Sequence, residues 1–320
     1  MHGSSELITL DDVRKAAIRI SGSVVRTPLL PAPWAQRLAL KPEGLQATGA
    51  FKLRGALNAV AMLAPDARAR GVVTHSSGNH AQALAWAARL HGVAATVVMP
   101  DAAAPVKVEA TRALGAEVVM VPAAERDSRV AELRAQRGLA FISPFDDLDV
   151  IAGAGTVGLE IIEDRPDLDT VLVPVGGGGL ISGVSTAVKA LAPEVRVVAV
   201  EPELAADLAE SMAAGERVAW DTAATYRTIA DGVRLPVVGE LTWPHIQAHV
   251  DDVVTVGEDA ILDAMALITT RSRVVAEPTG ALAVAAFLAA PDRFGETAAV
   301  VTGGNADPAL LARVLTGRTA

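Results

Sequence analysis

Lys52 is the first residue of this sequence that could do covalent chemistry. The chain has only five lysines, and Lys52 lies between an aromatic and an apolar residue, just before a segment with a helical pattern. Burial lowers the pKa of a lysine. An amine that forms an imine with a carbonyl compound requires such a lowered pKa. The lysines at 41, 107 and 189 lie among charged or small residues, so we predict that Lys41, Lys107 and Lys189 are at the surface. For a lone lysine at a helix start, a solvated head is the commoner interpretation.

Two turns between a predicted strand and a predicted helix could bind anions. Residues 176–179 are four glycines, whose backbone can wrap a phosphate with its N–H groups pointing inward. Residues 74–80 (THSSGNH) offer a helix N-terminus and polar side chains, which suit a substrate carboxylate. The alternatives are a flexible tight turn for the glycines and ordinary helix capping by Ser76, Ser77 or Asn79. Four consecutive glycines cost so much chain entropy that phosphate binding is favoured there.

A third polar group, Thr302, follows the last predicted strand in the sequence VTGGN. It presents a hydroxyl at the carboxyl end of a strand, where open α/β folds bind ligands. A hydroxyl can hydrogen-bond a pyridine nitrogen without protonating it. The glycine run at 176–179 matches neither the dinucleotide fingerprint nor the Walker A loop, because Leu180, Ile181 and Ser182 follow it. A nucleotide-binding oxidoreductase, the alternative from a different class, is therefore disfavoured.

Regular elements must position these turns, and the hydrophobic pattern predicts them. The predicted strands are residues 71–74, 94–99, 117–121, 170–175, 195–200 and 298–301, and the predicted helices are residues 82–91, 104–114, 180–191 and 281–290. The strands are continuous apolar runs, as in parallel sheets that are buried on both faces. The alternation of strands and helices predicts a doubly wound α/β architecture.

Composition narrows the functional classes. The chain is 51% hydrophobic and only 3% aromatic, which predicts a sizeable core of Ala, Val, Leu and Ile. A net charge of −9 disfavours nucleic acid as a partner, and the absence of cysteine excludes disulfides and a thiol nucleophile. The first ten residues show no signal-peptide pattern, and the apolar stretch 281–290 is too short to span a bilayer. We therefore expect a cytoplasmic protein that does not bind membranes.

Six segments, in the same order, resemble the fold-type II pyridoxal-phosphate family, which includes threonine dehydratase and serine racemase. They are KPE with Gln46 followed by GAFKLRGALNAV, then THSSGNHAQALAWAA, VPVGGGGLISG, TIADGV, AEPTGA and VTGGNAD. The resemblance runs roughly from Val25 to Asp307. It implies two doubly wound α/β domains, as in the β subunit of tryptophan synthase, with the active site in the cleft between them. A small domain at 74–147 would lie within a large cofactor-binding domain made of 1–73 and 148–320, and the protein would be a homodimer.

The resemblance also implies how pyridoxal phosphate is held. Lys52 would bind it as an imine and then act as the base at the substrate Cα, and Phe51 would pack against its ring. Asn79 would hydrogen-bond the 3′-oxygen of the ring, and Thr302 would face the ring nitrogen. The phosphate would be bound by Gly176, Gly177, Gly178 and Gly179.

Four residues would surround the substrate carboxylate according to the same resemblance: Ser76, Ser77, Asn79 and His80. Ser77 aligns with the serine that acts as the acid/base on the opposite face in serine racemases. His80 taken alone would most often be a structural histidine.

A metal site is implied by the segment EPELAAD, which keeps the spacing of the divalent-cation site of serine racemase-like members. Glu201 and Asp207 would supply carboxylate oxygens, and Ala205 its carbonyl oxygen. Hard oxygen ligands suit Mg²⁺, with Ca²⁺ or Mn²⁺ as alternatives. The other interpretation is a solvated acidic turn.

The activity implied is that of an L-threonine or L-serine ammonia-lyase, which forms a 2-oxo acid and ammonia by β-elimination from a small hydroxy amino acid. Serine racemase and 3-hydroxyaspartate dehydratase are the alternatives. Phe145 after Pro144 agrees with the dehydratases, because serine racemases tend to carry Asn there. Ala50 departs from the usual serine, and residues 123–129 match the family poorly. Because the chain ends soon after Thr302, we expect no regulatory C-terminal domain.

Overall fold

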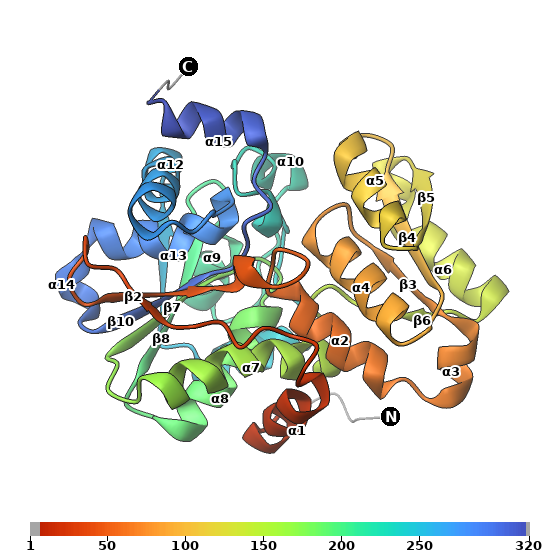
Figure 1. Cartoon of the computed structure of the whole chain (residues 1–320), viewed down its shortest axis with the longest axis horizontal. Helices are drawn as coiled ribbons and strands as arrows, with labels where there is room; N and C mark the ends of the chain where they lie inside the picture. The colour runs from red at the N-terminus through yellow and green to blue at the C-terminus, as the bar shows by residue number, and fades with distance from the viewer. Residues whose placement is uncertain (1–6, 318–320) are drawn as a thin grey trace.

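Two separate β-sheets organise this protein, whose computed structural model describes residues 7–317 (Figure 1). The strands of the larger sheet are β1 (Leu30–Pro31), β2 (Leu38–Pro42), β7 (Thr170–Pro174), β8 (Arg196–Pro202), β9 (Asp252–Val256) and β10 (Thr297–Val301). Those of the smaller sheet are β3 (Val72–His75), β4 (Ala95–Pro100), β5 (Glu117–Val121) and β6 (Ala140–Phe141). The strand orders are β1-β2-β10-β7-β8-β9 and β5-β4-β3-β6. Every pairing is parallel except that of β1 with β2, so the predicted doubly wound architecture is confirmed.

Helices cover both sheets. The α-helices are α1 (Leu10–Ile20), α2 (Lys52–Met62), α3 (Pro65–Arg70), α4 (Asn79–Leu90), α5 (Pro105–Ala113), α6 (Arg126–Arg137), α7 (Leu148–Asp164), α8 (Gly179–Leu191), α9 (Asp207–Ala214), α10 (Thr222–Thr225), α11 (Thr242–His249), α12 (Glu258–Leu267), α13 (Pro278–Ala289), α14 (Pro291–Phe294) and α15 (Pro308–Leu315). Shorter turns are η1 (Glu43–Leu45), η2 (Ala123–Glu125), η3 (Asp231–Val233) and the π-helical η4 (Ile268–Ser272).

All ten elements that the sequence predicts are present. The predicted strands correspond to β3, β4, β5, β7, β8 and β10, and the predicted helices to α4, α5, α8 and α13. Within the described part of the chain, no helix is long and apolar enough to cross a membrane. Of the first ten residues, which lack a signal-peptide pattern, residues 1–6 lie outside that part.

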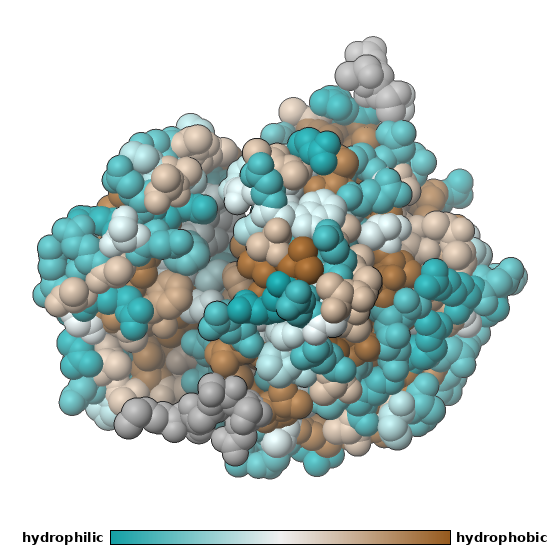
Figure 2. Space-filling view, turned by 180° about the vertical axis from the view of Figure 1, so that it is seen from behind, coloured by the Kyte–Doolittle hydropathy of each residue, from teal (hydrophilic) through white to brown (hydrophobic). Residues whose placement is uncertain are grey.

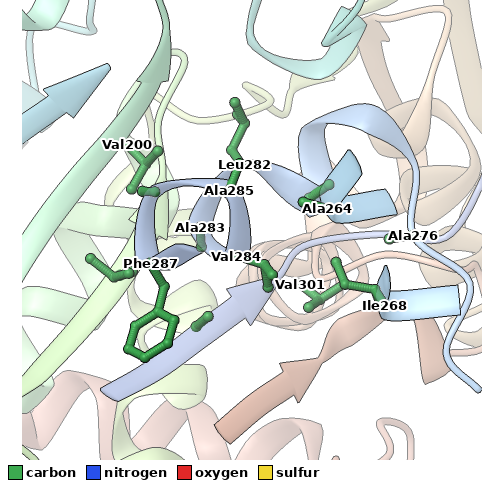
Figure 3. Close-up of a cluster of buried hydrophobic side chains, with 14 of the residues drawn as sticks. Val200, Ala264, Ile268, Ala276, Leu282, Ala283, Val284, Ala285, Phe287 and Val301 are labelled. Atoms are coloured by element: carbon green, nitrogen blue, oxygen red, sulfur yellow. The ribbon is translucent and has the colours of Figure 1, made fainter. Parts of the chain in front are cut away.

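Helix α13 illustrates how a core with few aromatic side chains is built (Figure 3). Its sequence is apolar on every side, and every residue from Pro278 to Phe287 is buried. A helix that is hydrophobic all round belongs in a protein interior. Its side chains share one cluster with Val200 of β8, Val301 of β10 and Ile268 of η4. The predicted core of Ala, Val, Leu and Ile is therefore confirmed, with Phe287 as a large exception.

Helix α2, which begins at Lys52, touches α7 backbone to backbone. A Cβ atom on Gly55 of α2 would lie 2.7 Å from the Val150 carbonyl oxygen, and one on Gly153 of α7 would lie 2.6 Å from the Arg54 carbonyl oxygen. Only glycine permits such an approach at both positions. The opposite face of α2 packs into the hydrophobic cluster of the smaller sheet. Helix α2 therefore connects the smaller lobe (residues 72–141) to the larger lobe, which is built on the six-stranded sheet.

The prediction that Lys41 lies at the surface is wrong. Lys41 lies on β2 and is fully buried, and its Nζ donates to Glu160 Oε2 and to the Thr27 carbonyl oxygen, both at 2.6 Å. Burial lowers the pKa of Lys41, and the Glu160 carboxylate opposes that decrease. Lys107 keeps 35% of its side chain exposed, as predicted, whereas the side chain of Lys189 is only 18% exposed.

Lys41 belongs to a buried group of four charged residues, Lys41, Glu43, Arg54 and Glu160, which we call the four-charge cluster. Arg54 donates from Nε and Nη2 to the two Glu43 oxygens at 2.7 and 2.8 Å, and from Nη1 to Glu160 Oε1 at 2.6 Å. The two cations balance the two carboxylates. The cluster joins β2, η1, α2 and α7, and Arg54 lies two residues after Lys52.

Candidate active site

Segments that are distant in the sequence meet at the carboxyl end of β10. Phe51 N donates to the Thr302 carbonyl oxygen at 3.0 Å, and Gly304 N donates to the Gly49 carbonyl oxygen at 2.9 Å. Gly49 has a φ of +72°, which glycine adopts most readily. These bonds place the start of α2, and with it Lys52, beside Thr302. Two of the predicted site segments are therefore neighbours in space.

Lys52 has the apolar setting that the sequence predicts. Its Nζ donates to the Pro144 carbonyl oxygen at 2.5 Å and lies 5.0 Å from the centre of the Phe51 ring. Burial lowers the pKa of Lys52 to about 8. A substantial share of this amine is therefore neutral near neutral pH, which suits a nucleophile or a base.

Asn79, the first residue of α4, is held by two other segments of the site. Its Nδ2 donates to Glu277 Oε1 at 2.6 Å, and its Oδ1 accepts from Asn305 Nδ2 at 2.9 Å. Burial, followed by the negative charge of Asp231, raises the pKa of Glu277 to about 7. Glu277 lies in the segment AEPTGA, which resembles the family, but no role for Glu277 follows from the sequence. The one indication of Glu277 in the sequence is its position as an acidic residue directly before a buried helix.

Ser76, Ser77 and Asn79 do not cap α4 in the ordinary way. The N-cap position is Gly78, no side chain bonds the first turn there, and Gly78 N instead donates to Ser76 Oγ at 3.3 Å. Ser76 and Ser77 are half-buried. The capping alternative is therefore wrong, and the helix N-terminus keeps its capacity to bind an anion.

His80 lies deeper than its neighbours and is only 2% exposed. Its Nε2 lies 3.3 Å from the Ile142 carbonyl oxygen, and its buried Nδ1 has no partner among the described residues. Burial and then the charge of Lys52 lower the pKa of His80 to about 3. The imidazole is therefore neutral in the physiological range.

The glycine loop is tightly enclosed by protein. A Cβ atom on Gly177 would lie 2.4 Å from the Phe145 ring, and one on Gly178, which has a φ of +90°, would lie 2.8 Å from Thr242 Oγ1. Cβ atoms on Gly176 and Gly179 would lie 2.9 Å from Val233 and 2.8 Å from Phe145. Helix α8 begins here without a side-chain cap. Phe145 and the Pro144 carbonyl, two contacts that the sequence did not predict, thus connect the glycine loop to Lys52.

Thr302 carries a buried hydroxyl that lacks a protein partner. The residue is 3% exposed, and its Oγ1 has no hydrogen bond among the described residues. Buried polar atoms are nearly always paired, so an orphaned one points to a missing ligand. The donor set of a neutral hydroxyl, a buried amine and a glycine loop at a helix N-terminus fits the ring nitrogen, aldehyde and phosphate of pyridoxal phosphate.

Glu201 and Asp207 form a buried pair of carboxylates, so the solvated-turn interpretation is wrong. The two side chains are 0% and 1% exposed. Glu201, on β8, accepts from Leu208 N at 3.0 Å and from Ala209 N at 2.9 Å, whereas Asp207 Oδ2 has no partner within the described part. Burial and the charge of Asp207 raise the pKa of Glu201 to about 8, and burial raises that of Asp207 to about 7.

The intervening Ala205 is buried in the same turn. Within residues 7–317, no group of three or more His, Cys, Asp or Glu side chains could hold a metal. A cation at this place would therefore depend on backbone carbonyls or water besides the two acids.

Residues 20–303 match the family model described as pyridoxal-phosphate dependent enzyme. The chain is 43% identical to the L-threonine ammonia-lyase of Thermotoga maritima, covering 97% of this chain and 78% of that protein. It is 40% identical to the beta-hydroxyaspartate dehydratase of Paracoccus denitrificans, covering 93% and 96%. The structure of maize serine racemase superposes with a TM-score of 0.90 at 37% identity, covering 98% of each chain. The family and the fold that the sequence predicts are confirmed.

Proposed function

Because this chain belongs to the family of pyridoxal-phosphate-dependent enzymes, we propose that it is an L-threonine or L-serine ammonia-lyase that forms a 2-oxo acid and ammonia. The observation that carries the proposal is the buried amine of Lys52, whose pKa is lowered to about 8 beside Thr302. Similarity to threonine ammonia-lyase over 97% of the chain supports the choice of reaction.

Five features of the chain would hold the cofactor. Gly176 to Gly179 would bind its phosphate at the start of α8, and Phe51 would pack on its ring. The orphaned Oγ1 of Thr302 would face the ring nitrogen, and Asn79 would contact the 3′-oxygen. Lys52 would hold the cofactor through Nζ. When bound, the cofactor supplies a sink for the electron pair that is released when the substrate Cα loses its proton.

The chain's own groups would carry the protons. Lys52 Nζ would take the proton from the substrate Cα, and its lowered pKa leaves a share of the amine free to accept it. The Pro144 carbonyl, 2.5 Å from Nζ, orients the amine by accepting a hydrogen bond. The β-hydroxyl would then leave as water with the proton that Lys52 Nζ had accepted, and hydrolysis of the enamine product would give the 2-oxo acid and ammonia.

The substrate carboxylate would lie at the N-terminus of α4, against Ser76, Ser77, Asn79 and His80. The absence of a side-chain cap on α4 supports this placement. Ser77 would be the acid/base of the opposite face. If Ser77 returns a proton to Cα, racemisation competes with elimination, and similarity to serine racemase supports that second activity.

We also propose a divalent cation, Mg²⁺ by preference, at Glu201, Ala205 and Asp207. The support is the burial of two acids with no Lys, Arg or His ion-paired to them among residues 7–317, and the unpartnered Oδ2 of Asp207. A homodimer in the cytoplasm is the further expectation, and sedimentation velocity would establish the assembly.

The test is to record the visible absorbance of the purified protein and to measure 2-oxo acid with L-threonine, L-serine and 3-hydroxyaspartate in turn. Oxo acid from L-threonine or L-serine supports the proposal and ranks the two substrates. Oxo acid from 3-hydroxyaspartate alone, or D-serine from L-serine without pyruvate, would replace the proposal with the corresponding alternative. Lys52→Ala is the control, and an unchanged absorbance spectrum in that variant would contradict the role of Lys52.

A further inference from the structure

Two of the contacts between the lobes, one buried and one exposed, bear on the position of Asn79. The inner contact is the hydrogen bond from Asn79 Nδ2 to Glu277 Oε1 at 2.6 Å, where Glu277 is 5% exposed. The outer contact is an ion pair between Lys107 Nζ on α5 and Asp231 Oδ2 on η3 at 2.8 Å. Its side chains are 35% and 42% exposed. Of the ion pairs among residues 7–317, this one alone joins the smaller lobe to the larger.

The two contacts are connected on both sides of the cleft. In the larger lobe, Gly232 N, next to Asp231, donates at 3.0 Å to Thr279 Oγ1, two residues after Glu277. In the smaller lobe, α5 packs against α4, whose first residue is Asn79. The ion pair and the hydrogen bond therefore hold a fixed spatial relation when the lobes are together.

The ion pair also acts electrostatically on the inner contact. After burial, the charge of Asp231 is the largest influence that raises the pKa of Glu277, and the charge of Lys107 works in the opposite direction. Both charges therefore reach the carboxyl group that accepts from Asn79.

The exposure of the pair suits a contact that opens in each catalytic cycle. Figure 2 shows a groove between the two lobes, and substrate must enter and product must leave through the space between them. An exposed ion pair shifts an equilibrium by only about fivefold or less, because water and salt screen it.

We propose that Lys107 and Asp231 are positioning residues whose ion pair clasps the smaller lobe over the cleft and seats Asn79 against Glu277. The inference rests on the proposed function only in taking the cleft as the place where substrate binds. Neither residue touches the reacting atoms in this assignment. The ion pair increases the fraction of protein molecules in which Asn79 contacts Glu277.

The kinetic test uses Lys107→Met and the exchanged double variant Lys107→Asp with Asp231→Lys. We expect Lys107→Met to raise KM for the amino acid about threefold to fivefold with a smaller change in kcat, and 0.5 M NaCl to reduce the difference from wild type. The exchanged pair should recover at least half of the loss. Lys189→Met is the matched control, because Lys189 forms a 2.7 Å ion pair with Asp251 within the larger lobe. It should leave KM unchanged.

A distance measurement tests the clasp without relying on activity. The chain has no cysteine, so spin labels at Glu109→Cys on α5 and Ala223→Cys on α10 would be the only ones. Figure 1 shows α5 and α10 on the facing sides of the smaller and the larger lobe. In the cofactor-bound protein, Lys107→Met should lengthen the label distance, and the exchanged pair should restore it.

Unchanged distances and unchanged KM in Lys107→Met would overturn the proposal. A longer distance with unchanged KM would overturn it too, because the pair would then join the lobes without seating Asn79. If no amino acid is turned over at all, the proposed function fails, and the label distances still decide whether the clasp exists.

Discussion

Two groups of buried charges in this protein differ in how their charge is balanced. In the four-charge cluster, Lys41 and Arg54 face Glu43 and Glu160, and each of the four is hydrogen-bonded. The second group, Glu201 and Asp207, has two carboxylates and no ion pair with Lys, Arg or His among residues 7–317. Buried charge is costly unless a partner compensates it.

The pKa values of two equally buried glutamates show what this difference does. Burial works to raise the pKa of Glu43, but the Arg54 guanidinium overcomes it and holds that pKa below its usual range. Burial and the charge of Asp207 raise the pKa of Glu201 to about 8. Glu43 and Glu201 are both 0% exposed. The difference between their pKa values therefore comes from the charge of the neighbouring residue and not from the extent of burial. The acidic pair is therefore the place where a cation from outside the chain would compensate a charge.

Breaking the balanced cluster should have the largest effect on stability. Arg54→Met leaves two carboxylates buried with one cation, so we expect the free energy of unfolding to fall by about 3–5 kcal/mol. Urea unfolding followed by circular dichroism measures it. Arg137→Met is the control, because Arg137 pairs with Glu117 at the surface, with side chains 45% and 48% exposed. That loss should stay below about 1 kcal/mol. Equal losses in the two variants would contradict the comparison.

Lys52 sharpens the comparison, because it is a buried cation without a carboxylate beside it. Burial lowers its pKa to about 8, whereas Glu160 opposes the same influence on Lys41. Only the neutral amine attacks an aldehyde, so cofactor-stripped protein should take up pyridoxal phosphate faster as pH rises, with a midpoint near 8. At pH 7.5 its neutral fraction is roughly 200 times that of an amine with an ordinary pKa. Absorbance after rapid mixing measures the rate, and Lys52→Arg is the control. A rate still climbing steeply at pH 10 would contradict the setting described for Lys52.

The unbalanced acidic pair should respond to divalent cations. A cation that binds only the folded state adds about 2.7 kcal/mol at a free concentration 100 times its Kd. We therefore expect a higher Tm in MgCl₂ than in EDTA, and no such difference in Asp207→Asn. Asp292→Asn, at an exposed acid that pairs with Arg37, should keep the full response. An identical Tm for the wild type in EDTA, MgCl₂, CaCl₂ and MnCl₂ would exclude a cation site here.

Local patterns were sufficient to predict the glycine loop, the central parallel strands and the setting of Lys52, because each depends on residues that are adjacent in the chain. The continuous apolar runs of β4 and β7 indicate directly that these strands are buried on both faces. Glycine is required at 177 and 179 because a Cβ atom there would collide with Phe145. The sequence shows the glycines, but only the structure shows the residue that they contact.

Tertiary partners explain what the sequence could not predict. Lys41 was predicted to be exposed because its compensating charge, Glu160, lies 119 residues away. The role of Glu277 depends on its contact with Asn79, which lies 198 residues away in the sequence. The hydrogen-bond partner of Lys52 is a backbone carbonyl, and no residue type in the sequence predicts such a partner. Long-range pairing of charges and backbone groups is therefore the part of the site that composition and spacing leave open.

The strand order of the larger sheet has a consequence for the order of events during synthesis. Strand β10 (297–301) lies between β2 and β7, so that sheet cannot close until residues 297–301 have been made. The smaller sheet draws all its strands from residues 72–141 and can form while the ribosome is still translating. Thr302 directly follows β10, so the candidate site stays incomplete until residues 297–302 have been made and placed. A ribosome that stalls after residue 141 would therefore release a folded smaller lobe with no site for the cofactor.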